Sequence, residues 1–472
     1  MHKKTFPNCV KIVSLKTFQF HLEIMHQVDD YTFQTKIYYP DVDLFQLSNR
    51  YNDTLLNKIY AHIAVCETFK YCSLFPAKID FTLISSHLSQ ETLEFFLKTF
   101  QHAYTQCKYE NRIGNEYKPI FIHEKLSDNE NTTLSIDQSE AHEPILVGNG
   151  GGKDSLLAMK LLEKSNLSYA VYQWSRPEYG SSKHQQELCS KLLQHASPVK
   201  CHKVSVYDDF TESPFMNLYY KELKGAFTLG IPECIFEALP VMLFNQYNTL
   251  CFANEKSSDT GNLYWEGIQG EVNHQWVKSL EAEIFFQEFI HRSLIKNFKF
   301  FSILKPIYDY RIFSHIANYP EFIKNSHSCN VDKPWCKKCP KCAYVWLGYL
   351  AHFEKSLVDQ IFGVNPFDDE DLIMHYKNMT GIEGHRSFEC IGNIEECQLF
   401  MKKCIEKGLQ GKMLDIFKNE VLKKIKTGPL SKIDSIKSIK NTTSLPSFLK
   451  ESKQSFRDYM RSRGSRPRIF SP

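Results

Sequence analysis

The residues best suited to chemistry form one short run, Gly150-Gly151-Gly152-Lys153-Asp154-Ser155. An apolar stretch at Ile145–Val147 predicts a buried strand before it, and leucines at helical spacing follow from Leu156. A strand, a glycine turn and a helix in this order present backbone N–H groups at a helix N-terminus, which favours an anion. Glycine allows a phosphate to approach the backbone closely. The run therefore predicts a phosphate-binding loop.

Spacing excludes two common phosphate loops. A Walker loop needs Ser or Thr directly after its lysine, and here Asp154 follows Lys153. The dinucleotide fingerprint needs three staggered glycines and a later acidic residue, and it fits poorly. A carboxylate beside a phosphate loop makes chemical sense with a magnesium ion, so we expect Mg²⁺ at Asp154. An ordinary glycine-rich turn between a strand and a helix is the alternative.

Four cysteines at short spacing make the second strong pattern: Cys329, Cys336, Cys339 and Cys342. Thiols at this spacing match a tetrahedral zinc–sulfur site. Because all four sulfurs would be ligands, no position is left open for water, and we expect a structural Zn²⁺. An iron–sulfur cluster uses the same ligand set and is the alternative.

Two further segments carry dense polar chemistry. An apolar run at Thr249–Ala253 predicts another buried strand, and it is followed by Glu255, Asp259, Asn262, Asn273, His274 and Lys278. This density suits a charged substrate with general acid–base groups close by, whereas a polar surface loop is the alternative. Between glycine turns at 381–392 lie His385, Glu389 and Cys390. This segment could close over the nucleotide and supply a base, or Cys390 is a buried structural thiol.

The elements that must position these residues predict an α/β fold with a doubly wound parallel sheet. Strands are expected at Tyr169–Gln173 and Val199–Val206, with a helix at His184–His195 between them. Ligands in such sheets lie at the carboxyl ends of the strands. We expect four regions: a mixed α/β domain at 1–140, a nucleotide domain with the four cysteines at 141–355, a helical and loop region at 356–426, and a tail at 427–472.

The first region has strand-like alternation at Val10–Leu15, Phe18–Glu23 and Thr32–Tyr39, and helical periodicity at Leu55–Tyr71. Glu67 and Lys70 fall within one turn of that helix and are interpreted as a surface pair. A polar stretch at 128–138 is the expected linker to the nucleotide domain.

The composition limits the classes of protein to which this chain can belong. The chain has 472 residues, 42% of them hydrophobic and 14% aromatic, which predicts a largely globular molecule. The sequence shows no signal-peptide pattern and no apolar run of the ~20 residues that span a bilayer, and its 15 cysteines favour reduced thiols. We therefore expect a cytoplasmic protein. The tail carries ten Lys or Arg against three Asp or Glu. We interpret it as a disordered, solvated basic end and expect no nucleic-acid or membrane partner.

The glycine run resembles the SGGxDS loop of the PP-loop ATP pyrophosphatases, with Gly150 in place of the serine. A four-cysteine site about 175 residues later is shared with 7-cyano-7-deazaguanine synthase and its relatives. More closely, several stretches across residues 1–410 are similar to the family of ATP-dependent UDP-N-acetylmuramoyl-L-alanyl-L-glutamate epimerases. They are GNGGGKDS, NEKSSDTGN, VNHQWVKSLEAE, WCKKCPKCAYVWLGYLAHF and GHRSFECIG.

The resemblance implies that ATP activates the terminal carboxylate of UDP-MurNAc-L-Ala-L-Glu, so that the L-Glu becomes D-Glu during peptidoglycan precursor synthesis. It implies ATP, Mg²⁺ and structural Zn²⁺, and a small-molecule substrate. By position, Gly150, Gly151, Gly152, Lys153 and Ser155 would bind the phosphates, with Asp154 on Mg²⁺. Glu255, Asp259, Asn262 and Asn273 would bind substrate, and His274, Lys278, His385, Glu389 and Cys390 would be catalytic. The base for the α-proton is expected among the last three.

Three alternatives stay open at this point. A ligase of the deazaguanine-synthase type would consume an amine or ammonia after activation. A nucleotide-binding protein without turnover is compatible with Gly150 but not with the intact Asp154 and Ser155. Modification of a nucleic acid guided by the basic tail is the third. The sequence leaves the oligomeric state open.

Overall fold

Ten strands form one sheet, in the order β12-β9-β6-β7-β8-β3-β2-β1-β4-β5. The computed structural model describes residues 6–127, 133, 144–224, 228–363 and 365–423, so the basic tail and, apart from Thr133, the expected linker lie outside the described residues. The strands are β1 Cys9–Phe18, β2 His21–Val28, β3 Tyr31–Tyr38, β4 Lys78–Asp80, β5 Ile120–Ile122, β6 Ile145–Gly148, β7 Tyr169–Ser175, β8 Cys201–Asp208, β9 Thr249–Phe252 and β12 Lys299–Ser302; β10 Leu263–Trp265 and β11 Gly270–Val272 form a separate hairpin.

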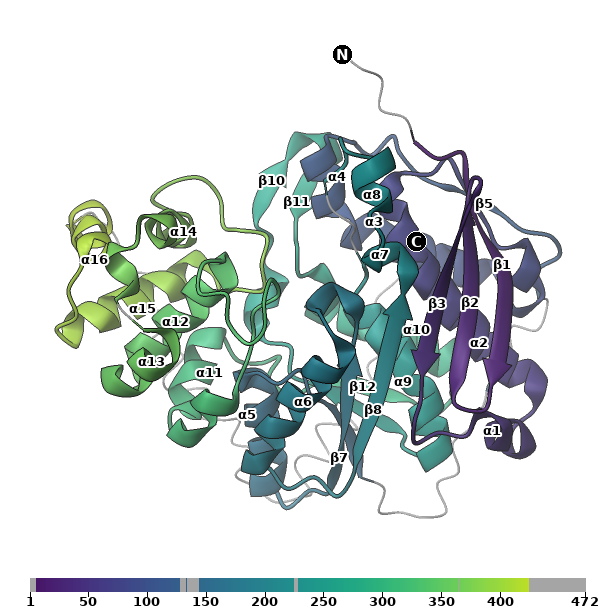
Figure 1. Cartoon of the computed structure of the whole chain (residues 1–472), viewed down its shortest axis with the longest axis horizontal. Helices are drawn as coiled ribbons and strands as arrows, with labels where there is room; N and C mark the ends of the chain where they lie inside the picture. Colours follow the sequence, from purple (N-terminus) through teal and green to yellow (C-terminus); the bar gives the residue numbers. More distant parts are fainter. Residues whose placement is uncertain (1–5, 128–132, 134–143, 225–227, 364, 424–472) are drawn as a thin grey trace, which may run out of the picture.

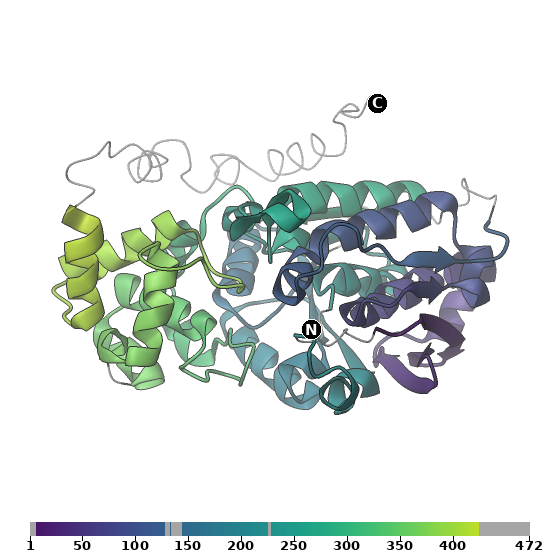
Figure 2. The same ribbon diagram turned by 90° about the horizontal axis from the view of Figure 1, so that it is seen from above.

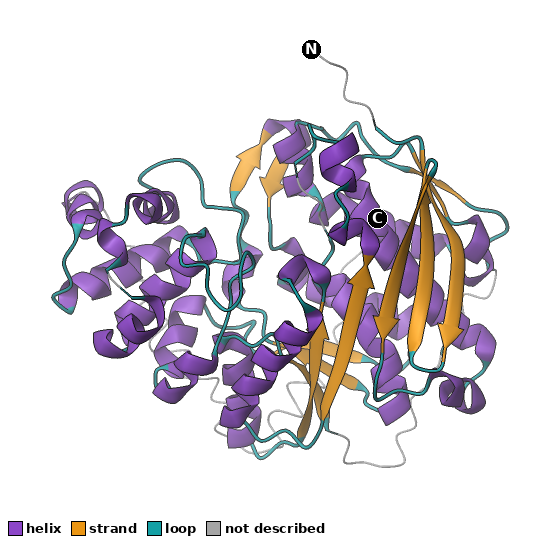
Figure 3. Ribbon diagram, in the orientation of Figure 1, coloured by secondary structure: helices purple, strands orange, loops and turns teal. Residues whose placement is uncertain are grey.

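The sheet is parallel where the glycine loop leaves it and antiparallel beside that part. Strands β12, β9, β6, β7 and β8 all run parallel, which confirms the expected α/β class. Strand β3 then pairs antiparallel with β8, and β2 and β1 continue the antiparallel part (Figure 3). One sheet thus runs across the expected domain boundary at residues 140 and 141, and that boundary stays a prediction.

Helices cover both faces of the parallel strands. Neighbouring side chains of β6 show this, because Leu146 joins one hydrophobic cluster with α9 and α10 while Val147 joins another with α5 and α11. The helices are α1 Leu44–Arg50, α2 Asp53–Thr68, α3 Gln90–Ala103, α4 Thr105–Asn111, α5 Lys153–Lys164, α6 Ser182–Leu192, α7 Asp209–Glu212, α8 Phe215–Tyr219, α9 Ile231–Asn245, α10 Leu280–Ser293, α11 Asp309–Ile316, α12 Pro340–His352, α13 Lys355–Phe362, α14 Glu370–Thr380, α15 Ile394–Glu406 and α16 Lys412–Phe417.

The helices after β12 form a layer at one end of the molecule (Figures 1 and 2). Helix α12 packs on α14 and α15, and it also packs on α11, which contacts α5. Helix α5 begins directly at the glycine loop. The core of this helical layer is therefore continuous with the core beneath the expected phosphate site.

The expectation for Glu67 and Lys70 is wrong. They are not a surface pair, because both side chains are fully buried. Arg176, at the end of β7, lies 2.6 Å from Glu67 and 3.2 Å from Glu233 of α9. Glu67 lies at the end of α2 and Lys70 in the 3-10 helix Phe69–Leu74 that follows it, so the two are paired as their spacing predicts. The spacing could not show that β3, β8 and α9 bury the pair.

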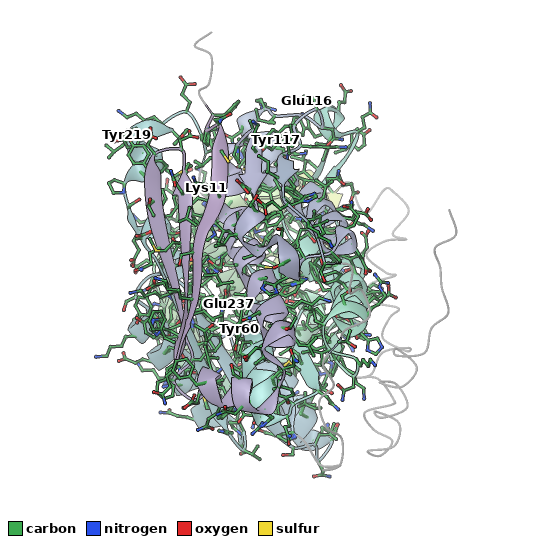
Figure 4. The ribbon with its side chains drawn as sticks, turned by 90° about the vertical axis from the view of Figure 1, so that its right-hand side faces the viewer. Lys11, Tyr60, Glu116, Tyr117, Tyr219 and Glu237 are labelled. Carbon is green, nitrogen blue, oxygen red and sulfur yellow. The ribbon has the colours of Figure 1, made fainter. Side chains whose placement is uncertain are left out.

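This buried cluster joins the antiparallel strands to the parallel part of the sheet. Lys70 also pairs with Asp208 of β8 and donates a hydrogen bond to Thr35 of β3. The acidic members outnumber the cations, and burial raises the pKa of Glu233 to about 8. Burial and the neighbouring Glu67 also raise the pKa of Glu237, a buried carboxyl group of α9, well above its ordinary value (Figure 4).

Removing the cation at the centre of this cluster should be costly. We expect Arg176→Met to lower the free energy of unfolding by about 3–5 kcal/mol, because it leaves buried carboxylates without their partner. Urea unfolding followed by circular dichroism measures the change.

The matched control is Lys355→Met, which removes an exposed lysine paired with Asp359 on α13 and should cost under about 1 kcal/mol. Equal effects of the two substitutions would contradict the assignment of Arg176 as the central cation.

Candidate active site

The glycine loop has the geometry of a phosphate site at the carboxyl end of β6. Gly151 has φ of +77°, and a Cβ there would lie 1.8 Å from the His327 ring, so only glycine fits. The Gly150 N–H donates to Ser155 Oγ over 3.0 Å, which fixes the predicted hydroxyl within the loop. No side chain caps the N-terminus of α5, which begins at Lys153. Its dipole and N–H groups are therefore available to an anion.

Three carboxylates converge on this loop, those of Asp154, Glu255 and Asp309. The sequence analysis predicted the first two as site residues. Lys153 Nζ lies 2.7 Å from Asp154 and 2.6 Å from Asp309, the residue that begins α11. Although burial lowers the pKa of Lys153, the two carboxylates outweigh it and raise that pKa. Burial raises the pKa of Asp154, and burial together with Asp309 and Asp154 raises that of Glu255.

These oxygen donors fit a magnesium ion. Carboxylates are the ligands that Mg²⁺ uses beside phosphates, and a divalent cation would relieve the mutual repulsion of these groups. Asp154 and Asp309 are the residues that would hold it, and Lys153 is already placed between them. The expected Mg²⁺ site at Asp154 thus gains a second carboxylate.

A cavity of about 230 Å³ opens beside the loop. Its lining combines loop residues and charged side chains, which are Gly150, Asp154, Ser155, Glu255 and Lys278, with apolar and aromatic side chains, which are Tyr172, Trp174, Ile231, Cys234 and Phe252. A lining of this mixed kind suits a ligand that has both phosphates and an aromatic base.

Lys278 connects this cavity to Cys390. Its ammonium donates to Cys390 Sγ over 2.9 Å, and His274 Nε2 lies 4.0 Å from the same sulfur. Burial alone would raise the pKa of the Cys390 thiol, but Lys278 and His274 lower it well below the ordinary 9.0. Lys278 and His274 thus favour the thiolate form of Cys390, and Lys278 connects this sulfur to the cavity.

The other candidate bases differ in their surroundings. Glu389 accepts a hydrogen bond from Asn330 over 3.1 Å, and burial raises the pKa of its carboxyl group. His385 is exposed and lies 5.0 Å from Phe388 between ring centroids, in a group of aromatic side chains. The structure thus places Cys390, Lys278 and His274 together, whereas His385 belongs to a neighbouring aromatic group.

Several expected substrate ligands hold the polypeptide around Cys390. Asn262 donates to the carbonyl of Ser387 over 2.9 Å and accepts from the His274 N–H. Asp259 accepts from Lys305 Nζ, and Asn273 donates to the carbonyl of Ser258. Of the four expected substrate-binding residues, Glu255 is the one that lines the cavity. Substrate binding by the other three stays a prediction.

The four cysteines converge as expected for a metal site. Their sulfurs all lie within 4.8 Å of one another, with Cys329 to Cys339 at 3.7 Å and Cys336 to Cys342 at 3.8 Å. Zn–S bonds of about 2.3 Å in a tetrahedron give sulfur–sulfur edges of about 3.8 Å. Backbone N–H groups also donate to three of the sulfurs, which suits thiolates. The donor set fits a closed structural Zn²⁺.

This cysteine site is linked to the Cys390 segment by two side chains next to its ligands. Lys341, beside Cys342, donates to the carbonyl of Cys390, and Asn330, beside Cys329, holds Glu389. From the other side, buried Arg386 donates to the carbonyl of Thr260 over 2.6 Å. The segment is therefore fixed between the cysteine site and the loop that precedes β10.

Metal removal should loosen this segment. After chelation we expect backbone amides at 387–391 to exchange with deuterium at least about tenfold faster, because Lys341 and Asn330 lose their fixed positions. Lys341→Met should do the same with the metal retained, and hydrogen-exchange mass spectrometry measures both.

Lys338→Met is the control, since Lys338 is an exposed lysine of the same turn. Unchanged exchange at 387–391 after chelation would contradict the link, as would equal effects of the two lysine substitutions.

Comparisons with known proteins match segments of the chain that carry several residues of this site. A family model described as the MurL C-terminal domain matches residues 323–426, and one described as the MurL N-terminal domain matches residues 236–303. The two matched segments contain all four cysteines, Cys390, His274 and Lys278, whereas the glycine loop and Asp309 lie outside them.

Three curated relatives carry the name UDP-N-acetyl-alpha-D-muramoyl-L-alanyl-L-glutamate epimerase. The protein of a Micromonospora species is 30% identical over 34% of this chain and 37% of its own length. That of Salinispora tropica is 29% identical over 52% of each chain, and that of Xanthomonas oryzae is 27% identical over 54% and 55%. The chain thus matches about half or less of each relative's length. In the part of the chain that the structure describes, no helix is long and apolar enough to cross a membrane.

Sequence reasoning missed several residues of this site. Asp309 follows β12, a four-residue strand whose apolar pattern was not recognised. Had Lys299–Ser302 been assigned as a parallel strand, its carboxyl end would have pointed to Lys305 and Asp309. Gln106, which contacts His274 Nδ1, and the aromatic residues of the cavity gave no local signal.

Proposed function

We propose that this chain is an ATP-dependent epimerase that converts the terminal L-Glu of UDP-MurNAc-L-Ala-L-Glu to D-Glu, in peptidoglycan precursor synthesis. One observation carries the proposal: Lys278 lines the cavity beside the glycine loop and also donates a hydrogen bond to Cys390 Sγ. A site for activating a carboxylate and a base for a neighbouring proton therefore share one side chain. The names of the three relatives support the same reaction.

Activation must come first in this chemistry. The α-proton of glutamate is very weakly acidic while the adjacent carboxylate is charged. In the proposed reaction a carboxylate oxygen attacks the α-phosphorus of ATP and pyrophosphate leaves, which gives an acyl-adenylate. The acyl group can then accept the electron pair of the broken C–H bond. After the proton returns to the opposite face, water releases the carboxylate and AMP.

The residues of the loop suit the first step. The N-terminus of α5 and the glycine loop would hold the leaving pyrophosphate, in a fold that is compatible with the PP-loop ATP pyrophosphatases. Bound Mg²⁺ would supply charge neutralisation at the phosphates, through Asp154 and Asp309. Lys153 is held by the same two carboxylates, so its ammonium adds positive charge at a fixed position.

The thiolate of Cys390 suits the second step. It would take the α-proton of the L-residue and become a thiol, while Lys278 keeps its charge. We assign the proton that returns to Glu389, because burial raises the pKa of its carboxyl group and thereby favours the protonated form. His274 lies 4.0 Å from the sulfur and assists the thiolate electrostatically.

The test is turnover of ATP and UDP-MurNAc-L-Ala-L-Glu in deuterated water. We expect AMP, pyrophosphate and D-Glu with one deuterium at Cα, measured by mass spectrometry and chiral amino-acid analysis. Cys390→Ala should keep AMP formation but lower D-Glu formation by at least about 100-fold, since general-base catalysis contributes 10²–10⁴-fold.

Each other outcome points to a different function. AMP without deuterium uptake would contradict an epimerase. A product containing nitrogen from added ammonia would favour the ligase alternative, and absence of AMP would favour a non-catalytic nucleotide-binding protein.

The ionisation of Cys390 provides a separate test. Because Lys278 lowers the pKa of the thiol, the thiolate should persist to well below pH 9 and be lost only as pH falls through that lowered pKa. We expect the rate of Cys390 alkylation by iodoacetamide to show its acid limb in that range.

Lys278→Met should move this limb to higher pH, whereas Lys278→Arg, which keeps the charge, should move it much less. The modified residue is identified by peptide mass spectrometry. An acid limb that lies at the same pH in all three proteins would contradict the assigned role of Lys278.

A further inference from the structure

A group of four aromatic side chains, each at least partly exposed, lies close to Cys390. It consists of Tyr109, Trp265, His385 and Phe388, and we refer to it as the aromatic platform. Tyr109 is central, with ring centroids 5.5 Å from Trp265 and 5.6 Å from Phe388. His385 is exposed and the other three are partly exposed, so the rings are not a sealed core.

Contacts place the platform next to the proposed chemistry. Lys278, which lines the cavity, contacts Cys390. Cys390 in turn lies near His274, whose Nδ1 contacts Gln106 of α4. Tyr109 lies one helical turn beyond Gln106 on the same helix. The platform is thus connected to the cavity through Cys390 and His274. In the proposed reaction, a substrate with its carboxylate at the loop and its α-carbon at Cys390 would have its remaining groups within reach of these rings.

We propose that the aromatic platform binds the muramoyl sugar ring of the substrate. This inference rests on the proposed function. One face of a pyranose ring carries C–H groups and is apolar, whereas its edges are polar, so half-exposed rings with polar surroundings suit it. Aromatic side chains offer such an apolar surface at low conformational cost.

The reach of the substrate agrees with this assignment. Phe388 is two residues from Cys390, so their Cα atoms are at most about 7 Å apart. In the substrate, two residue lengths, also about 7 Å when extended, separate the glutamyl α-carbon from the α-carbon of the lactyl unit, which an ether oxygen joins to the sugar. The uracil ring lies much further along the molecule. The sugar is therefore the ring that reaches the platform when the α-carbon is at Cys390.

A cation stands beside the platform. Arg112 is exposed, and its guanidinium lies 5.0 Å from the centroid of the Tyr109 ring. In the substrate the diphosphate is attached directly to the muramoyl sugar. Arg112 would therefore meet the first charged group beyond the sugar, and a guanidinium can bind phosphate oxygens bidentately.

Kinetics with three substrates test the platform. The substrates are UDP-MurNAc-L-Ala-L-Glu, MurNAc-L-Ala-L-Glu and L-Ala-L-Glu, and AMP release gives KM and kcat for each. We expect Tyr109→Ala and Trp265→Ala to raise KM roughly tenfold for the two sugar-bearing substrates. Their kcat should change little, and L-Ala-L-Glu should be unaffected. Arg112→Gln should raise KM only for the substrate that carries the diphosphate.

The control is Tyr207→Ala, which removes an exposed tyrosine of β8, 48% accessible, outside the platform. Equal loss with L-Ala-L-Glu would show that the rings only support the Cys390 segment and would overturn the proposal. A KM effect of Tyr109→Ala confined to the UDP-bearing substrate would assign the rings to uracil and also overturn it.

Saturation-transfer NMR with MurNAc-L-Ala-L-Glu gives a readout that needs no turnover. We expect contact signals from the sugar protons with the unaltered protein and their loss in Tyr109→Ala. If the unaltered protein forms no AMP and gives no sugar signals, the proposed function and this inference both fail. If it is active but the Tyr109 and Trp265 variants match the Tyr207 control, only this inference fails.

Discussion

The placement of one ammonium group determines what the candidate active site can do. Lys278 is half-buried and lies near both Glu255 and Cys390, and these acidic groups together raise its pKa although desolvation lowers it. Without that charge, burial would keep Cys390 a neutral thiol, as it does for the many other buried cysteines of the described chain. The contact between Lys278 and Cys390 is what brings the polar segment after β9 and the Cys390 segment into one site.

The surrounding structure serves to hold that contact in place. Cys390 belongs to an irregular segment, and such segments need outside partners to stay in one conformation. Arg386 fixes it to the loop before β10, and Lys341 fixes it to the start of α12 beside the cysteine site. A structural metal would thus do more than close a turn. It would fix the start of α12, from which Lys341 holds the segment that carries Cys390, the proposed base.

Local spacing explains which features could be predicted from the sequence. The glycine loop, the four cysteines and the strands around Ile145, Tyr169 and Thr249 are each encoded within a few residues, and the structure has them. The interval Phe18–Glu23 was predicted as one strand, but it contains the hairpin turn between β1 and β2. That turn has no glycine, proline or asparagine to mark it.

Contacts between distant segments could not be predicted in the same way. Glu67 and Lys70 looked exposed because the residues that bury them come from β3, β8 and α9. Asp309 belongs to the site only through tertiary packing and lies in no distinctive local pattern. Lys341 lies within the four-cysteine pattern, but its contact with the carbonyl of Cys390 also depends on tertiary packing. Cys390 was among the candidates, but the lysine that activates it lies 112 positions earlier.

The close approach of Gly151 and His327 has a consequence for how the protein is made. The backbone N–H of His327 donates to the Gly151 carbonyl over 3.0 Å, and its ring occupies the space above that glycine. The loop therefore gains its full set of contacts only when a segment some 175 residues later has been synthesised and has packed against it. Until then, the growing chain carries the sequence of the proposed phosphate loop without these contacts, so an anion that binds the finished loop would not stabilise early folding intermediates through it.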